Sequence, residues 1–86
     1  MTNDEVKALI EAGIQNAEVI VNGDGSHFEA IVVAELFSDM RPVKRQQTVY
    51  GTVNEQIASG AIHALTIKAM TSAEWETAKK FQVTGS

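Results

Sequence analysis

Two histidines are the side chains in this sequence best suited to bind a metal. His27 and His63 are the only histidines among the 86 residues, and each stands at the start of an apolar run. A neutral imidazole is a common metal ligand and also titrates near neutral pH. Two exposed histidines that merely happen to precede strands would give the same pattern, so the residues alone leave both interpretations open.

The chain contains no cysteine. This excludes structural disulfides, thiol catalysis and any cysteine-ligated metal site that the chain forms alone. Any thiolate in a metal site must therefore come from another molecule.

Acid–base chemistry is the other use of these histidines. With a nearby acid such as Asp24 they resemble a general acid–base pair. The sequence has no recognisable nucleophile motif or phosphate-binding loop, and a chain this short indicates no substrate pocket. We therefore expect no enzymatic activity.

Three cations, which we call the basic cluster, lie within five residues: Arg41, Lys44 and Arg45. The whole chain carries a net charge of −4, which repels phosphate backbones, so nucleic-acid binding would depend on this cluster. A KH domain holds nucleic acid through a Gly-x-x-Gly loop, and the comparable residues 40–45 contain no glycine. The cluster is equally consistent with a solvated helix start. Arg45 could form either a salt bridge within the chain or a contact with a partner.

The elements that position these residues begin with a helix and a hairpin. Thr2 and Glu5 have the spacing of a capping box, and apolar residues recur on one helical face after them. Residues 17–22 and 28–37 have the composition of two strands. A turn-forming, glycine-containing segment joins them, so we expect an antiparallel hairpin whose flexible loop ends at His27.

A helical crossover and a third strand follow the hairpin. Pro42 ends the second strand, and apolar residues then recur at helical spacing as far as Ser59, with Gly51 as a point where the helix divides. From Ala64 to Met70, apolar residues alternate with more polar ones, which is typical of a half-buried strand. His63 therefore stands immediately before a strand.

The chain ends in a predicted helix. Thr71 and Glu74 repeat the capping-box spacing, and we expect residues 82–86 to form a frayed tail. With 44% hydrophobic and 21% charged residues, the chain has the composition of one globular domain, residues 1–86. The apolar runs are too short and too charged to span a membrane, and the first residues lack a basic and apolar leader, so we expect a cytoplasmic protein.

The predicted order, α-β-β-α(α)-β-α, has a geometric consequence. A strand, a helical crossover and another strand of the same sheet normally form a parallel pair with a right-handed connection. The fold class is therefore α/β in the broad sense, or α+β, with a three-stranded mixed sheet. The second and third strands would start at the same edge of the sheet, so His27 and His63 would face one patch of solvent.

The same residues carry a resemblance to a known family. The sequence resembles the BolA family in a signature that extends over nearly the whole chain: Phe37, Val43, Arg45, Val49-Tyr50, His63-Ala64-Leu65 and Thr71 to Glu74-Trp75. The segment Val43–Gln47 is similar to the IbaG-type branch of that family. Many members have Arg-His where this chain has Arg45-Gln46, so a role for that second histidine does not carry over.

The resemblance implies a single BolA-like domain, similar to the class II KH fold, that interacts with a monothiol glutaredoxin and shares a [2Fe-2S] cluster with it. It also implies that His63 matches the family's C-terminal cluster-binding histidine, and that His27 matches the loop position where members carry cysteine or histidine. Because such a cluster needs four terminal ligands and this chain offers two imidazoles, a glutaredoxin cysteine and glutathione would supply the two thiolates.

The expected function is therefore iron–sulfur cluster trafficking, or regulation in response to iron, redox or acid stress. The alternative is a KH-like nucleic-acid-binding transcriptional regulator that uses Arg41, Lys44 and Arg45. The sequence leaves DNA contact and a weak homodimer open.

Overall fold

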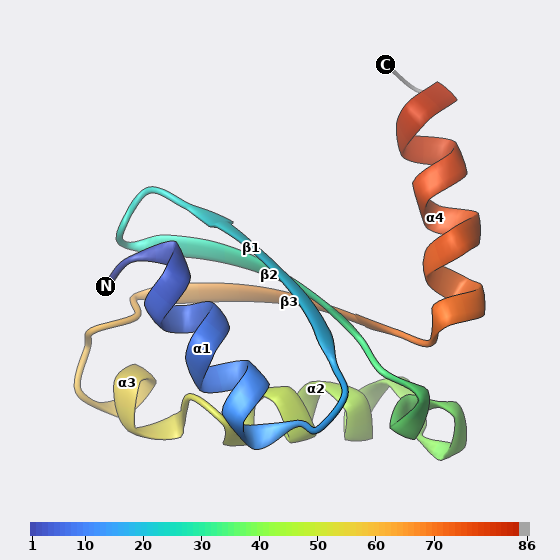
Figure 1. The fold of residues 1–86 in the computed structure, drawn as a ribbon. Coiled ribbons are helices and arrows are strands. Elements are labelled where there is room, and N and C mark those ends of the chain that lie inside the picture. Colours follow the sequence, from blue (N-terminus) through green and yellow to red (C-terminus); the bar gives the residue numbers. More distant parts are fainter. Residues whose placement is uncertain (85–86) are drawn as a thin grey trace.

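The computed structural model describes residues 1–84, with side chains as far as Lys80. It confirms the predicted order of elements and adds one short 3₁₀ helix, η1. The elements are α1 (Asn3–Gly13), β1 (Glu18–Gly23), β2 (His27–Val33), η1 (Glu35–Asp39), α2 (Pro42–Gly51), α3 (Asn54–Ala58), β3 (Ala64–Met70) and α4 (Ser72–Thr84). Figure 1 shows their arrangement.

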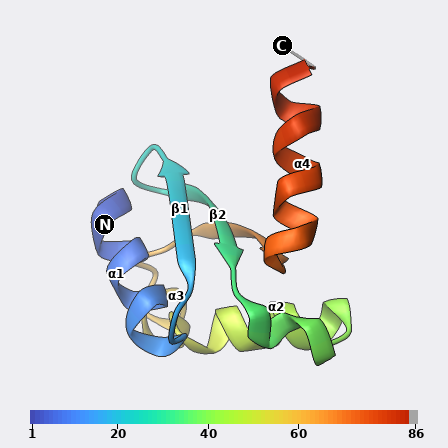
Figure 2. The same ribbon diagram turned by 45° about the vertical axis from the view of Figure 1, so that its right-hand side comes forward.

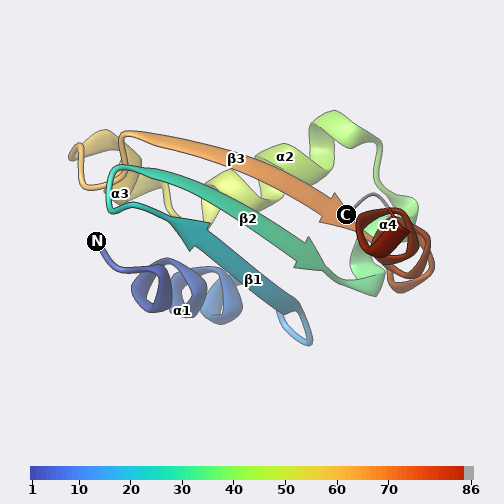
Figure 3. The same ribbon diagram turned by 90° about the horizontal axis from the view of Figure 1, so that it is seen from above.

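The three strands form a mixed sheet, as predicted. β2 lies in the centre, antiparallel to β1 and parallel to β3. β2 and β3 start at the same end of the sheet, where His27 lies opposite Ala64 in the register. Figure 3 shows this end from above, with the β1–β2 turn and the start of β3 close to the N-terminal end of α1.

The helices are distributed unequally over the two faces of the sheet. Figures 1 and 2 show α1, α2 and α3 on one face, whereas α4 leaves the end of β3 and extends away on the other side. The main core lies between the sheet and the helices on this face, and includes Phe28, Ala30 and Val32 of β2. Successive strand residues face opposite sides, so Ile31 and Val33 contact Trp75 of α4 on the second face.

Both predicted capping boxes are present. The Thr2 N–H donates to Glu5 Oε1 at 2.8 Å and the Glu5 N–H donates to Thr2 Oγ1 at 3.1 Å. At the start of α4, Thr71 and Glu74 exchange the same pair of hydrogen bonds, at 2.8 and 3.3 Å. Each box satisfies backbone donors that have no partner within the helix, and so fixes where the helix begins.

Two predicted boundaries are wrong. The second strand ends at Val33 rather than Phe37, because the chain turns into η1 and places the Phe37 side chain in the core with 0% of its surface exposed. The last helix continues to Thr84, beyond its predicted end before Gln82. Residues 85–86 of the predicted tail lie outside the described part of the chain.

The predicted division of the crossover helix is confirmed. α2 ends at Gly51 and α3 begins at Asn54, with Val53 fully buried between them. None of the helices within residues 1–84 has both the length and the apolar character that crossing a bilayer requires.

Candidate metal-binding site

The parallel pairing of β2 and β3 places the two histidines side by side in the backbone. The Ser26 carbonyl accepts hydrogen bonds from the N–H groups of His63 and Ala64, each at 3.2 Å. His27 is the first residue of β2 and pairs with Ala64 in the register, so His63 lies one residue before that pair, at the entry to β3. Both histidines are exposed. The prediction that β2 and β3 start at the same end of the sheet is confirmed.

The loop before His27 is held by the side chain of Asp24. Oδ1 of this residue accepts hydrogen bonds from the N–H groups of Ser26 and His27, each at 3.0 Å. These two backbone donors, that of His27 first, lower the pKa of the Asp24 carboxyl below its ordinary value. Gly25 lies within this turn at φ 100°, a conformation that glycine adopts without strain.

Asp24 also lies beside the imidazole of His27. The distance from Asp24 Oδ1 to His27 Nδ1 is 3.9 Å, and each side chain is 73% exposed. This separation is too long for a hydrogen bond but short enough for an electrostatic interaction. The imidazole nitrogen in this contact is Nδ1.

The strand that follows His63 is fixed by side chains from α2. Arg45 Nη1, Gln46 Nε2 and Tyr50 Oη donate to the carbonyl oxygens of Ala69, Ile67 and Leu65, at 3.3, 2.7 and 2.8 Å. These alternate carbonyls lie on the free edge of β3, the edge that β2 does not pair with. The α2 side chains thus complete the hydrogen bonding of an edge strand and hold its register.

The segment that enters β3 is anchored as well. Ile62 is 2% exposed, and its N–H donates to the Gln56 carbonyl at 3.0 Å. Gly60 provides the turn before it at φ 84°. His63 therefore projects from backbone that is fixed on both sides, whereas His27 follows a loop.

The candidate metal-binding side chains at this end of the sheet are the two imidazoles of His27 and His63. Among the described residues, no group of three or more His, Cys, Asp or Glu side chains is placed to hold a metal ion. Two exposed imidazoles at one edge of the sheet provide half of the four terminal ligands that a [2Fe-2S] cluster needs. The residues present therefore fit such a cluster only if a second molecule completes the ligand set.

The structure separates the three cations of the basic cluster. Arg41 and Lys44 are exposed at the start of α2, whereas the Arg45 side chain is only 15% exposed. Arg45 forms a 2.7 Å ion pair with Glu74 and donates through Nε to the Met40 carbonyl at 3.1 Å. Arg45 is thus a structural salt-bridge residue, which sequence reasoning had left open.

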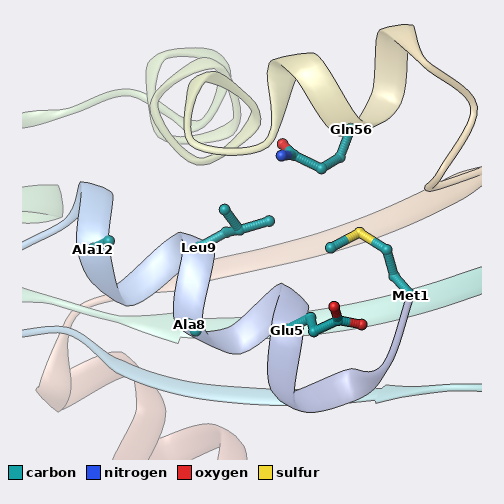
Figure 4. Close-up of a pocket in the computed structure, with 6 residues that line it drawn as sticks. All are labelled: Met1, Glu5, Ala8, Leu9, Ala12 and Gln56. Atoms are coloured by element: carbon teal, nitrogen blue, oxygen red, sulfur yellow. The ribbon is translucent and has the colours of Figure 1, made fainter.

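A shallow groove between α1 and α3 is a separate feature. It has a volume of about 340 Å³ and a largely apolar lining, formed by Met1, Glu5, Ala8, Leu9, Ala12 and Gln56. Figure 4 shows these side chains, and Figure 1 shows α3 and the first turn of α1 at the same end of the sheet as the start of β3. Neither histidine lines the groove.

Known proteins with similar sequences and structures agree on one family. The family described as BolA-like protein matches residues 5–74. The acid stress protein IbaG of Escherichia coli K12 is 50% identical over 80 residues, which cover 93% of this chain and 95% of that relative. A protein of Vibrio cholerae named DNA-binding transcriptional regulator BolA is 37% identical over 71 residues, 83% of this chain and 63% of the relative.

A solved structure supports the same assignment. A BolA homologue from Coxiella burnetii has a TM-score of 0.80 and 36% identity, with 88% of this chain and 97% of that chain covered. Fold, sequence signature and family match thus agree. The chain belongs to the BolA family, in its IbaG-type branch.

Proposed function

We propose that this protein is a non-catalytic, cytoplasmic partner of a monothiol glutaredoxin and shares a [2Fe-2S] cluster with it. His27 and His63 are the proposed ligands from this chain, and the glutaredoxin cysteine and glutathione are the proposed thiolates. The proposed role is cluster trafficking, or regulation in response to iron, redox or acid stress. The observation that carries the proposal is the position of two exposed imidazoles on adjacent strand starts in a chain without cysteine.

The chemistry of the ligands supports this division between two proteins. When bound, the cluster supplies an iron that accepts imidazole in place of thiolate, and such replacement raises its reduction potential, as in Rieske centres. Only neutral imidazole binds metal, so protons compete with iron for the histidines and retention of a histidine-ligated cluster depends on pH. The name of the Escherichia coli relative, acid stress protein IbaG, is consistent with such a dependence.

The two histidines have different tasks in this proposal. His63 stands at the entry to β3, which hydrogen bonds fix on both edges, so its position is set before the partner arrives. His27 follows the 24–26 turn and is the ligand that adjusts to the partner.

The experiment is a titration of a cluster-loaded monothiol glutaredoxin, with glutathione, by this protein. We expect the visible absorption and circular-dichroism spectra to change on mixing, because His27 and His63 would take the places of two terminal thiolate ligands, which are released. Lys44→Ala is the matched control, since it removes an exposed charge away from the histidines, and it should give the parent spectrum. Spectra equal to the sum of the separate proteins would contradict the proposal.

A second candidate function, DNA binding, is favoured by one observation. Arg41 and Lys44 are exposed together at the start of α2, and the Vibrio cholerae relative is named a DNA-binding transcriptional regulator. If both cations contact phosphate, the double variant Arg41→Ala/Lys44→Ala should lower the slope of log affinity against log salt by about two. An unchanged slope, or no binding by the parent at low salt, would exclude these residues as a DNA surface.

A further inference from the structure

The turn before His27 carries a carboxylate whose position bears on how that histidine binds metal. We propose that Asp24 is a positioning residue that holds the His27 proton on Nδ1, so that Nε2 is the nitrogen offered to the metal. This inference rests on the proposed function, because it concerns the same ligand.

Hydrogen bonds to the backbone of Ser26 and His27 fix the position of Asp24. Its Oδ1 accepts the N–H groups of Ser26 and His27 at 3.0 Å, and its own N–H donates to the His27 carbonyl at 3.3 Å. The carboxylate therefore moves with the backbone of His27. The same Oδ1 is the oxygen 3.9 Å from His27 Nδ1.

This arrangement selects one tautomer of the imidazole. A neutral imidazole carries one proton, and whichever nitrogen lacks it has the lone pair that binds metal. A carboxylate beside Nδ1 favours the proton on Nδ1 and leaves the lone pair on Nε2. Metal-bound histidines commonly donate their other N–H group to a carboxylate. In this structure the contact at 3.9 Å is electrostatic and not yet a hydrogen bond, so the carboxylate acts through its charge.

The expected loss of metal affinity depends on how exposed the Asp24 and His27 side chains are. Removing such an outer partner typically costs about 10–100-fold in metal affinity. Both side chains are 73% exposed, so water and salt screen the interaction and the lower end of that range applies. We therefore expect loss of the carboxylate to weaken retention of the cluster several-fold without preventing its formation.

The substitution Asp24→Asn separates this role from that of the turn. Asparagine keeps Oδ1 as an acceptor for the two backbone N–H groups, so the loop is retained, but it removes the negative charge beside Nδ1. Asp24→Ala removes both the acceptor oxygen and the negative charge. Glu18→Gln makes the same change of charge at the far end of β1, where Glu18 is exposed and opposite Val33.

The first measurement uses the free protein and needs no cluster. Imidazole ¹⁵N chemical shifts recorded about two pH units above the ordinary histidine pKa of about 6.5 report the tautomer of each ring. We expect mainly Nδ1–H at His27 in the parent and in Glu18→Gln, and a shift toward Nε2–H in Asp24→Asn, with backbone amide shifts of the loop retained. His63 is the internal reference and should not change. A His27 that is mainly Nε2–H in the parent, or unaltered in Asp24→Asn, would overturn the inference.

The second measurement is the rate at which a chelator removes the cluster from the complex with glutaredoxin. Asp24→Asn should accelerate loss of the cluster several-fold, and Asp24→Ala should accelerate it further. Glu18→Gln should leave the rate unchanged. A tautomer change without faster loss would also overturn the inference. If the parent forms no mixed complex, the proposed function fails, and the tautomer result still decides whether Asp24 sets the proton position of His27.

Discussion

At the scale of single residues, the two proposed ligands differ in how firmly the backbone holds them. His63 follows the buried Ile62 and precedes a strand bonded on both edges, whereas His27 follows a turn. We expect His63→Ala to abolish the mixed-ligand spectrum. We expect His27→Ala to leave a weaker and more labile one, because water or a neighbouring group replaces a ligand that follows a turn more readily than one that follows a buried residue.

Thermal unfolding provides the control for these variants. Both histidines are exposed, so each substitution should change the free energy of unfolding by no more than about 0.5 kcal/mol. A parent-like spectrum for His63→Ala would contradict its role as a ligand. Unfolding of that variant would show that the side chain has a structural role instead.

Arg45 illustrates a residue whose role depends on contacts distant in sequence. Arg45→Ala leaves the carbonyl oxygens of Met40 and Ala69 without this donor, and should destabilise the fold by about 1–3 kcal/mol in urea unfolding. Glu74→Gln should cost less, because Glu74 is 49% exposed and exposed ion pairs contribute at most about 1 kcal/mol. Equal stability of Arg45→Ala and the parent would contradict the structural role.

The same ion pair predicts a pH dependence. The Thr71 N–H group first, and then Arg45, lower the pKa of Glu74 from its ordinary value of 4.5. Because the folded pKa is lower than the unfolded one, the contribution to stability is fully present above pH 4.5 and is lost as the pH falls through the folded pKa. The stability difference between the parent and Glu74→Gln should therefore shrink in acid. A constant difference from pH 7 to about pH 3 would contradict this linkage.

At the scale of elements, the absence of a side chain at Gly23 allows the end of β1 to lie close to the start of β2. A Cβ atom there would lie 2.6 Å from the His27 carbonyl oxygen and 2.6 Å from Phe28 Cδ1, closer than atoms approach without displacement. Gly23→Ala should lower the unfolding temperature and shift the backbone amide signals of residues 24–28. Gly51→Ala is the matched control, because a Cβ there meets no atom within 4 Å, and it should leave stability equal or higher. Similar behaviour of the two variants would contradict the close approach at Gly23.

The elements that could be predicted from sequence are those set by local pattern. Capping boxes, alternation in the strands and the crossover rule placed His27 and His63 at one edge of the sheet, as the structure shows. The end of β2 could not be predicted, because residues 28–37 are one apolar run and only packing brings Phe37 into the core. The bonds from Gln46 and Tyr50 to β3 were also missed, since they join residues 15 or more positions apart.

At the scale of the whole molecule, the proposed function requires two proteins to contribute to one cluster. The chain has no cysteine, and its described residues offer no group of three metal-binding side chains. The isolated protein should therefore remain colourless after anaerobic reconstitution with iron and sulfide. A brown preparation of this chain alone would show that two external thiolates are not needed.

The most direct test of the shared cluster is pulsed electron paramagnetic resonance of its reduced form. Histidine labelled with ¹⁵N is incorporated only into this chain, which is then mixed with unlabelled, cluster-loaded glutaredoxin and glutathione. We predict ¹⁵N couplings from two directly bound imidazoles, with one lost in His27→Ala. A reduced cluster in the mixed complex without ¹⁵N coupling from this chain would contradict the proposal that its histidines bind iron.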